Sequence, residues 1–394
     1  MTPLAGPELV IAGLLAVIAG IGLITALISL LRTTKPAPVV EAPAMLFIPV
    51  TGSGVDLNRL ARLLSAQTLK PRRLVFIVES KEDPAYRRLH QVLPLAPQPA
   101  EIFVAGPATA ASQKSHNLAR ALARYDDGSD IMALADADIA PQPDWLADLT
   151  RPLARGTASI VSGYRWVVPT DARPASLAGA WIERAVASLP KPQWYQLAWG
   201  GSLAFAPGVL RRIAAVEVLE AAVSDDMSLA AAAGCHGIEV MYRSRLLVPT
   251  PMSHSFASLV SFGARQYQML RLHEPSIWLN SLLVTSASLL LKAWLWSHAF
   301  VSPVWLKGLA AFLAVTYLTY GLRLLRAWRL KCWTIGSPRA EAAMLLVPLT
   351  GPLIELVHLL AILKGWSIKR VQWAHCAYEL EQGKVVRIER RPWV

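Results

Sequence analysis

The stretch from Leu9 to Leu31 carries no charged side chain and constrains the fold most strongly. As a helix rising about 1.5 Å per residue, it is long enough to cross a bilayer. A cleaved signal peptide would have a shorter apolar core behind a basic start, whereas here Glu8 precedes the run and Arg32 and Lys35 follow it. The basic flank predicts that the N-terminus lies outside the cell and that the following residues lie in the cytoplasm.

The composition supports a membrane protein. Of the 394 residues, 54% are hydrophobic and only 17% are charged, which is typical of a chain with membrane spans. The net charge of +12 indicates an anionic membrane surface or a phosphorylated substrate as partner. No basic cluster is interleaved with aromatic residues, so we expect no nucleic-acid partner.

The cysteines and histidines predict neither a disulfide framework nor a hydrolase. Cys235, Cys332 and Cys376 lie far apart without metal-ligand spacing, which fits a reducing cytosol. The eight histidines are also scattered without ligand spacing, which argues against a metallohydrolase. The absence of a Gly-x-Ser-x-Gly motif argues against a serine hydrolase.

Residues 44–250 alternate between strand and helix patterns, which predicts an α/β domain with a mostly parallel sheet covered by helices. The Gly52-Ser53-Gly54 segment is interpreted as a turn, because Leu57 stands where a dinucleotide loop needs a third glycine. The expected strands are Met45–Val50, Leu74–Val78, Glu101–Ala105, Ile131–Ala135 and Ser159–Ser162, and the expected helices are Leu57–Gln67, Gln113–Arg124 and Pro143–Leu153, the last opened by its proline.

The strand Ile131–Ala135 leads directly into Asp136 and Asp138. Residues i and i+2 of an extended chain point to the same side, so both carboxylates can face one bound ion or phosphate group. Ligands of open α/β sheets bind at the carboxyl ends of strands. The pair therefore predicts a site for Mg²⁺ or Mn²⁺, although aspartate is also common in the turn that follows a strand.

Two further motifs carry polar groups suited to catalysis. Asp225 and Asp226 open an alanine-rich helix, where acidic residues suit the helix dipole, but where Asp226 could also act as a general base. Gln268 and Arg271 lie one turn apart on a later helix. Arg271 could pair with diphosphate oxygens or with lipid headgroups.

The C-terminal part returns to the membrane. Leu259–Leu272 is an amphipathic helix expected at the membrane surface, and Ile277–Ala299 and Val304–Leu322 are expected spans in which Lys292 and Lys307 could snorkel. Ala342–Leu363 is apolar but interrupted by prolines, and a full span would place the basic tail outside the cell, so a broken, re-entrant or interfacial helical segment is favoured over a transmembrane one. The predicted domains are 1–43 (span and linker), 44–250 (catalytic), 251–275 (interfacial helix), 276–331 (two spans), 332–368 (apolar segment) and 369–394 (cytoplasmic tail hairpin turning at Gln382-Gly383).

The order of these motifs resembles the membrane-bound glycosyltransferases of family 2, and most of all ceramide glucosyltransferase and the hopanoid-associated glycosyltransferases. The Asp-x-Asp motif of that group matches Asp136 and Asp138, and its acidic pair matches Asp225-Asp226, with Asp226 as the catalytic base. Its Gln-x-x-Arg-Trp motif matches Gln268 and Arg271, but Leu272 replaces the tryptophan. Lys114 and Asn117 match a nucleotide-sugar contact stretch, and Gly200-Gly201-Ser202 matches the strand on the acceptor side.

A second position departs from this pattern. The aspartate that holds the nucleotide base in the family falls at Ser80, so Glu79, Glu82 or Asp83 would have to replace it. Ser80 itself remains within the expected base-binding segment.

The resemblance implies a glycosyltransferase type A domain and a metal-dependent, inverting transfer from a UDP-sugar to a hydroxyl of a ceramide-like or hopanoid-like lipid. It also implies a multi-pass protein of the inner membrane with a cytoplasmic catalytic domain. Asp136 and Asp138 would bind the metal ion, with Asp136 also near the nucleotide. A catalytically inactive scaffold and a polysaccharide synthase are the competing hypotheses.

Overall fold

The computed structural model describes residues 6–33, 40, 43–192, 195–332, 336–367 and 369–393. The chain forms two compact units. The sheet unit comprises Thr34–Arg165, Lys191–Thr250 and Ser367–Val394, and the helical unit comprises Met1–Thr33, Trp166–Pro190 and Pro251–Trp366.

The sheet unit is built on a seven-stranded sheet with the order β3-β2-β1-β4-β6-β5-β7. Strands β1 to β4 pair in parallel, whereas β6 is antiparallel to both β4 and β5. The predicted mostly parallel α/β fold is therefore confirmed. The strand bounds are β1 (Ala44–Pro49), β2 (Arg73–Val78), β3 (Ala100–Val104), β4 (Ile131–Leu134), β5 (Ile160–Pro169), β6 (Leu203–Phe205) and β7 (Val240–Met252).

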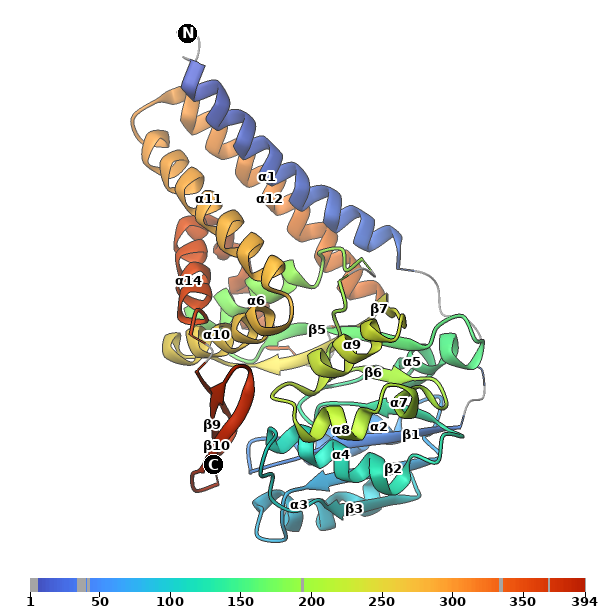
Figure 1. Cartoon of the computed structure of the whole chain (residues 1–394). Helices are drawn as coiled ribbons and strands as arrows, with labels where there is room; N and C mark the ends of the chain where they lie inside the picture. The colour runs from blue at the N-terminus through green and yellow to red at the C-terminus, as the bar shows by residue number, and fades with distance from the viewer. Residues whose placement is uncertain are drawn as a thin grey trace. The chain divides into compact units, whose positions relative to one another are not determined.

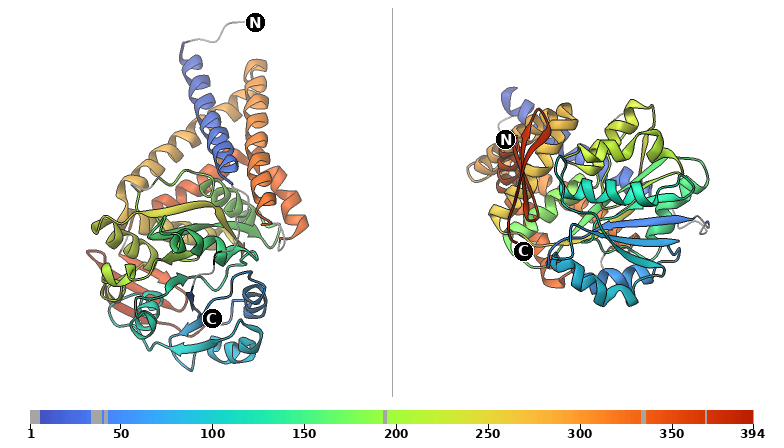
Figure 2. Two further views of the ribbon diagram at one scale, coloured as in Figure 1. Left: turned by 90° about the vertical axis from the view of Figure 1, so that its right-hand side faces the viewer. Right: turned by 60° about the horizontal axis from the view of Figure 1, so that its bottom comes forward.

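Helices cover both faces of this sheet (Figure 2). In β1, Leu46 and Ile48 join one apolar core, while Met45 and Phe47 join the core on the opposite face. Because successive side chains of a strand alternate between faces, a strand covered on both sides reads as one continuous apolar run. The first face carries α2 (Leu57–Ser65), α3 (Pro84–Val92) and α5 (Trp145–Ala154), and the second carries α4 (Gln113–Tyr125), α7 (Val209–Arg212), α8 (Ala215–Glu220) and α9 (Asp225–Cys235).

Two predicted elements differ from the structure. The helix expected from Pro143 begins at Trp145, because the carbonyl of Pro143 accepts a hydrogen bond from the Thr68 backbone and the chain turns there. The short strand expected at Ser159–Ser162 is the beginning of the much longer β5, whose last residues belong to the helical unit.

Four helical stretches of the described residues are long and apolar enough to cross a membrane (Figure 1). They are α1 (Gly6–Leu31), α11 (Pro275–Ala299), α12 (Pro303–Arg329) and the stretch Pro338–Lys364. The last is broken, as predicted: the 3₁₀ segment η2 (Met344–Thr350) contains Pro348 and separates α13 (Pro338–Ala343) from α14 (Gly351–Lys364). Proline cannot donate the backbone hydrogen bond that a continuous helix needs. The same unit contains α6 (Pro174–Val186) and α10 (Phe256–His273).

Lys292, which the sequence predicted could snorkel, has an acidic partner within the helical unit. Its ammonium group pairs with the carboxylate of Glu355 on α14, and the hydroxyl of Ser288 donates a 3.0 Å hydrogen bond to the same carboxylate oxygen. A charge on an apolar helix is thus matched by an opposite charge on a neighbouring one, which lowers the cost of placing either in a membrane.

The C-terminal tail belongs to the sheet unit and forms a separate antiparallel sheet. Its strands are β8 (Arg370–Trp373), β9 (Cys376–Glu381) and β10 (Lys384–Arg390). The predicted turn at Gln382-Gly383 is present, with φ angles of +50° and +78° that suit a two-residue hairpin. A second tight turn, with Ala374 at φ +48°, joins β8 to β9 and holds His375.

Candidate functional site

Lys114 lies at the centre of the candidate site. Its ammonium nitrogen is 2.7 Å from Oδ1 of Asp136 and 3.0 Å from Oδ2 of Asp225. Ser112 caps α4, so Lys114 stands in the first turn of that helix. The ion pairs join the start of α4 to the residues after β4 and to the start of α9. This is the carboxyl edge of the parallel strands, where α/β sheets bind ligands.

Asp226 lies beside this cluster and is held by three hydrogen bonds. Its Oδ2 accepts one from the backbone N–H of Gly200 at 2.8 Å. Its Oδ1 accepts one from the hydroxyl of Ser224 at 2.6 Å and one from the backbone N–H of Met227 at 2.8 Å. The carboxylate is therefore fixed in orientation while the residue remains partly accessible to solvent.

Gly200 allows the loop before β6 to approach the cluster. A Cβ atom added there would lie 2.6 Å from Oδ2 of Asp225 and 2.9 Å from the ammonium nitrogen of Lys114. Contacts this short do not occur for a real side chain, so a larger residue would force the ion pair apart. The small-residue segment that the sequence assigned to the acceptor side therefore contacts the acidic cluster directly.

The electrostatics of the site follow from an excess of carboxylates. Burial by itself would lower the pKa of Lys114, but the carboxylates of Asp136, Asp225 and Asp226 outweigh that effect and raise it. Burial is the largest cause that raises the pKa of Asp225, to about 6; the attraction of Lys114 acts in the opposite direction, and repulsion from Asp226 and Asp136 adds to the effect of burial. The pKa of Lys114 is thus raised by the surrounding carboxylates, whereas the pKa of Asp225 is raised mainly by burial.

Asp138 extends the same negative region. The residue is open to solvent, yet the protein atoms crowded around its carboxyl group raise its pKa, and repulsion from Asp136 adds to this. Arg165 and Lys114 act in the opposite direction. Mg²⁺ and Mn²⁺ prefer carboxylate oxygens as ligands, and the negative charge of the carboxylates here exceeds the nearby positive charge. The side chains of Asp136 and Asp138 are therefore chemically suited to a divalent cation.

The residues predicted at the nucleotide base, Glu79, Ser80, Glu82 and Asp83, lie after β2 in different surroundings. Both oxygens of Glu79 are engaged: Oε2 lies 2.9 Å from Nε2 of His375, and Oε1 accepts a 2.8 Å hydrogen bond from Nε of Arg390. Ser80 accepts a hydrogen bond from the backbone of Glu82.

Asp83 combines a structural role with a free acceptor. Its Oδ1 accepts hydrogen bonds from the backbone N–H groups of Gly52 at 2.9 Å and Ala85 at 2.8 Å, so it caps α3 and fixes the turn after β1. Its Oδ2 is buried and has no hydrogen-bond partner among the described residues. Of the predicted base-binding residues, Asp83 thus offers a buried acceptor.

Asn117 is buried and hydrogen-bonds to Gln113, a residue that was not predicted to belong to the site. Its Oδ1 accepts a 2.8 Å hydrogen bond from Nε2 of Gln113. Gln113 also donates to the carbonyl of Gly106 at 2.9 Å and accepts from the backbone N–H of Ala108 at 2.9 Å, which shapes the loop before α4. The sequence does point to Gln113, because it begins the Gln-Lys-Ser-His-Asn segment that contains the predicted residues Lys114 and Asn117.

Gln268 and Arg271 belong to the helical unit, on α10. The guanidinium carbon of Arg271 lies 4.3 Å from the ring centroid of Trp366 and 5.4 Å from that of Trp278. Aromatic rings therefore contact Arg271 although Leu272 replaces the expected tryptophan. The catalytic roles of Gln268 and Arg271 stay predictions.

Most of the chain matches one known protein family. The sequence model of glycosyl transferase family 21 matches residues 13–386. The chain belongs to glycosyl transferase family 21. This match confirms the predicted resemblance to ceramide-glucosyltransferase-like glycosyltransferases.

Solved structures similar to the family 21 chain share little sequence with it. A mannosyltransferase, PcManGT from Pyrobaculum calidifontis with GDP-Man and Mn²⁺, is 17% identical, with a TM-score of 0.41, covering 91% of this chain and 98% of that one. Glucosyl-3-phosphoglycerate synthase from Mycobacterium tuberculosis, with Mn²⁺, UDP-glucose and phosphoglyceric acid, is 13% identical, with a TM-score of 0.40, covering 60% of this chain and 84% of that one. No curated protein sequence matches the chain.

Proposed function

We propose that the family 21 chain transfers a sugar from a UDP-sugar to a hydroxyl group of a membrane lipid, with inversion at the anomeric carbon. The observation that carries the proposal is the position of Lys114, which holds Asp136 and Asp225 on either side of one ammonium group. It brings the Asp-x-Asp segment and the acidic pair, far apart in the sequence, to one edge of the sheet. A phosphate-binding region and a candidate base are then neighbours.

On the donor side, Asp83 would replace the family's base-binding aspartate. Its buried Oδ2 could accept a hydrogen bond from the N3–H of uracil. That bond would replace the hydrogen bonds to water that the oxygen loses on burial. Lys114 and Asn117 would support the diphosphate and sugar through the first turns of α4. Glu79 and Ser80 border the same segment.

Asp136 and Asp138 would hold the divalent cation, Mg²⁺ or Mn²⁺. Such an ion neutralises negative charge that develops on a departing diphosphate. Lys114 would share this task, because its pKa is raised by the surrounding carboxylates and it stays protonated at neutral pH.

Asp226 would act as the general base. It would remove the proton from the lipid hydroxyl while that oxygen attacks the anomeric carbon and the bond from the sugar to the diphosphate breaks. Its hydrogen bonds to Gly200, Ser224 and Met227 would keep the reacting carboxylate in one orientation. A positioned base of this kind contributes about 10²–10⁴-fold to a rate. Arg271, supported by Gln268, would pair with the leaving diphosphate.

The apolar helices suit an acceptor that stays in the bilayer. Four stretches are long enough to cross it, which fits a multi-pass protein of the inner membrane with its catalytic side in the cytoplasm. A ceramide-like or hopanoid-like lipid would then reach the site without leaving the membrane. Retention of Asp136, Asp138 and Asp226 argues against an inactive scaffold.

Purified protein in detergent, supplied with labelled UDP-sugars and a membrane lipid extract, tests the proposal. We expect labelled glycolipid to form with Mn²⁺ or Mg²⁺ and to be lost when the metal is chelated. Binding of UDP-sugar without any transfer would favour the scaffold. Formation of a long polymer would favour a polysaccharide synthase.

A further inference from the structure

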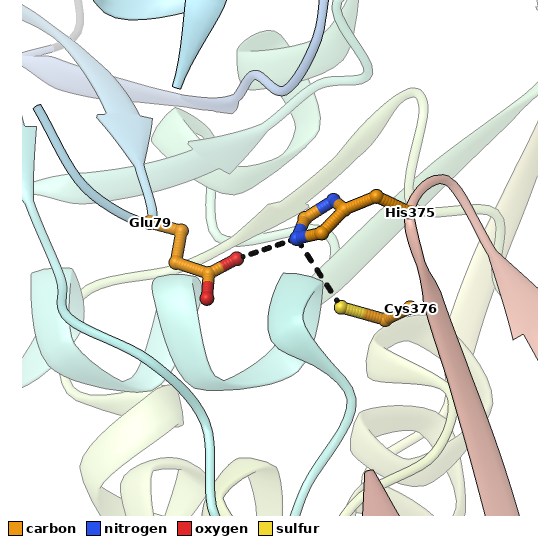
Figure 3. Close-up of side chains that lie close together, drawn as sticks. All are labelled: Glu79, His375 and Cys376. Carbon is orange, nitrogen blue, oxygen red and sulfur yellow. Dashed lines mark hydrogen bonds and ion pairs between the residues drawn. The ribbon is translucent and has the colours of Figure 1, made fainter. Parts of the chain in front are cut away.

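A second cluster of potential metal ligands lies away from the Asp-x-Asp segment, at the end of β2 and the turn of the tail sheet. Glu79, His375 and Cys376 are all buried, and one potential ligand atom from each lies within 4.8 Å of the other two (Figure 3). Nε2 of His375 is 2.9 Å from Oε2 of Glu79 and 3.4 Å from Sγ of Cys376. Figure 3 shows the imidazole between the carboxylate and the thiol.

We propose that Glu79, His375 and Cys376 bind a zinc ion that fastens the C-terminal tail sheet to the sheet unit's core. Bonds of about 2.0–2.3 Å from zinc to nitrogen, oxygen and sulfur place the ligand atoms of a tetrahedral site roughly 3.3–3.7 Å apart. The 3.4 Å separation of His375 Nε2 from Cys376 Sγ lies in that range, the 2.9 Å separation from Glu79 Oε2 is a few tenths of an ångström shorter, and all three atoms lie within 4.8 Å of one another. A non-protein ligand would fill the fourth position.

The ligand types separate this site from the Asp-x-Asp segment. Imidazole nitrogen and thiolate sulfur suit zinc, whereas Mg²⁺ and Mn²⁺ prefer oxygen ligands such as Asp136 and Asp138. The inference therefore does not depend on the proposed transfer reaction.

Arg390 supports the cluster without occupying its ligand atoms. Its Nε donates to Oε1 of Glu79, the oxygen that does not contact His375. Hydrogen bonds from outside a metal site commonly orient the ligating carboxylate in this way. The ring of His375 also packs against the ring of Trp393, with centroids 3.7 Å apart and the ring planes tilted by 42°.

A zinc ion here would order the donor side of the site. Arg390 also donates to the carbonyl of Ala108 at 2.8 Å, and the hydroxyl of Tyr378 accepts a 2.9 Å hydrogen bond from the backbone of Gln113. The tail thus contacts the loop before α4 as well as the end of β2. Fixing the tail turn to Glu79 would fix both segments together.

Metal analysis of the full-length protein in detergent tests the proposal. After reconstitution with zinc and removal of loosely bound metal, we expect about one zinc ion per chain. Cys376→Ser and His375→Gln should lose most of it. The matched control is Cys235→Ser, which removes an exposed thiol and should retain the zinc.

Cobalt provides a measurement on the wild-type protein, in case the variants fail to fold. Co²⁺ bound at this site should give a thiolate-to-metal absorption band, which zinc should abolish by displacement. The Asp136→Asn/Asp138→Asn double variant should keep its zinc even when sugar transfer is lost. No zinc in the reconstituted protein, or full zinc in Cys376→Ser, would overturn the proposal.

Discussion

The ammonium nitrogen of Lys114 lies 2.7 Å from Oδ1 of Asp136, which joins the first turn of α4 to the residue that follows the buried strand β4. The same nitrogen lies 3.0 Å from Asp225, so one positive charge is shared by carboxylates from two distant segments. The cluster keeps an excess of negative charge. A bound divalent cation should therefore stabilise the protein through this cluster.

Lys114→Met should lower the thermal stability of the metal-free protein, because it leaves Asp136 and Asp225 without their counter-ion. Removing one partner of a well-buried pair costs roughly 3–5 kcal/mol, and the partial exposure of Asp136 places the loss at or below the lower end. Mn²⁺ should then stabilise the variant more than the wild type, since it replaces the missing charge. Thermal unfolding with Mn²⁺ and with a chelator measures both effects. Lys114→Arg, which keeps the charge, is the control, and equal stabilisation of all three proteins by Mn²⁺ would count against the model.

Gly200→Ala should reduce transfer strongly while the protein still folds. The added Cβ would meet Asp225 at 2.6 Å and Lys114 at 2.9 Å, so the ion pair or the loop that binds Asp226 must move. Displacement of reacting groups by about 1 Å can cost roughly 100-fold in rate. Steady-state transfer rates test this, with Gly13→Ala as the control because an added Cβ there meets no atom within 4 Å. Normal activity in Gly200→Ala would show that the approach of this loop is unimportant.

Asp83→Asn tests donor recognition without removing the helix cap. The remaining Oδ1 can still accept from Gly52 and Ala85, while the amide replaces the buried acceptor Oδ2. We expect the KM for the UDP-sugar to rise roughly tenfold with little change in kcat, because one hydrogen bond to a buried group is lost. Asp56→Asn, at the exposed cap of α2, should leave the KM unchanged. An unchanged KM in Asp83→Asn would assign uracil recognition to another residue.

Glu355→Leu should reduce the yield of folded protein, because it leaves the ammonium group of Lys292 without its carboxylate among apolar helices. Replacing both residues with leucine should restore much of the loss, since an apolar pair often substitutes for a buried ion pair. Size-exclusion chromatography and thermal unfolding in detergent compare Glu355→Leu and Lys292→Leu with the double variant. A double variant as unstable as Glu355→Leu would show that the pair does not act as a unit.

The sequence predicted the parts of the fold whose information is local. The continuous apolar runs marked β1, β2 and β4, and the i and i+2 spacing of Asp136 and Asp138 placed both after a strand. The antiparallel position of β6 beside β4 was not predicted, because a three-residue strand has too little pattern to reveal its direction.

Contacts between residues far apart in the chain could not be predicted, because no local pattern links the two partners. Glu79 was expected at the nucleotide, but its partners His375 and Arg390 come 296 and 311 positions later in the chain. The spacing of cysteines and histidines likewise gave no metal motif, because the ligands of the candidate zinc site come from separate elements. Only folding of the tail against β2 makes them neighbours.

The central claim is that Asp226, beside the Lys114 cluster at the carboxyl edge of the sheet, removes the proton from the hydroxyl group of the lipid acceptor. The most direct measurement compares the sugar-transfer rate and the UDP-sugar dissociation constant of Asp226→Asn with those of the wild type. Ser224→Ala serves as the control, since it removes one hydrogen bond to the base but keeps the carboxylate. We predict a fall in rate of about 10²–10⁴-fold in Asp226→Asn with donor binding retained, and a much smaller fall in Ser224→Ala. Undiminished transfer in Asp226→Asn would contradict the account.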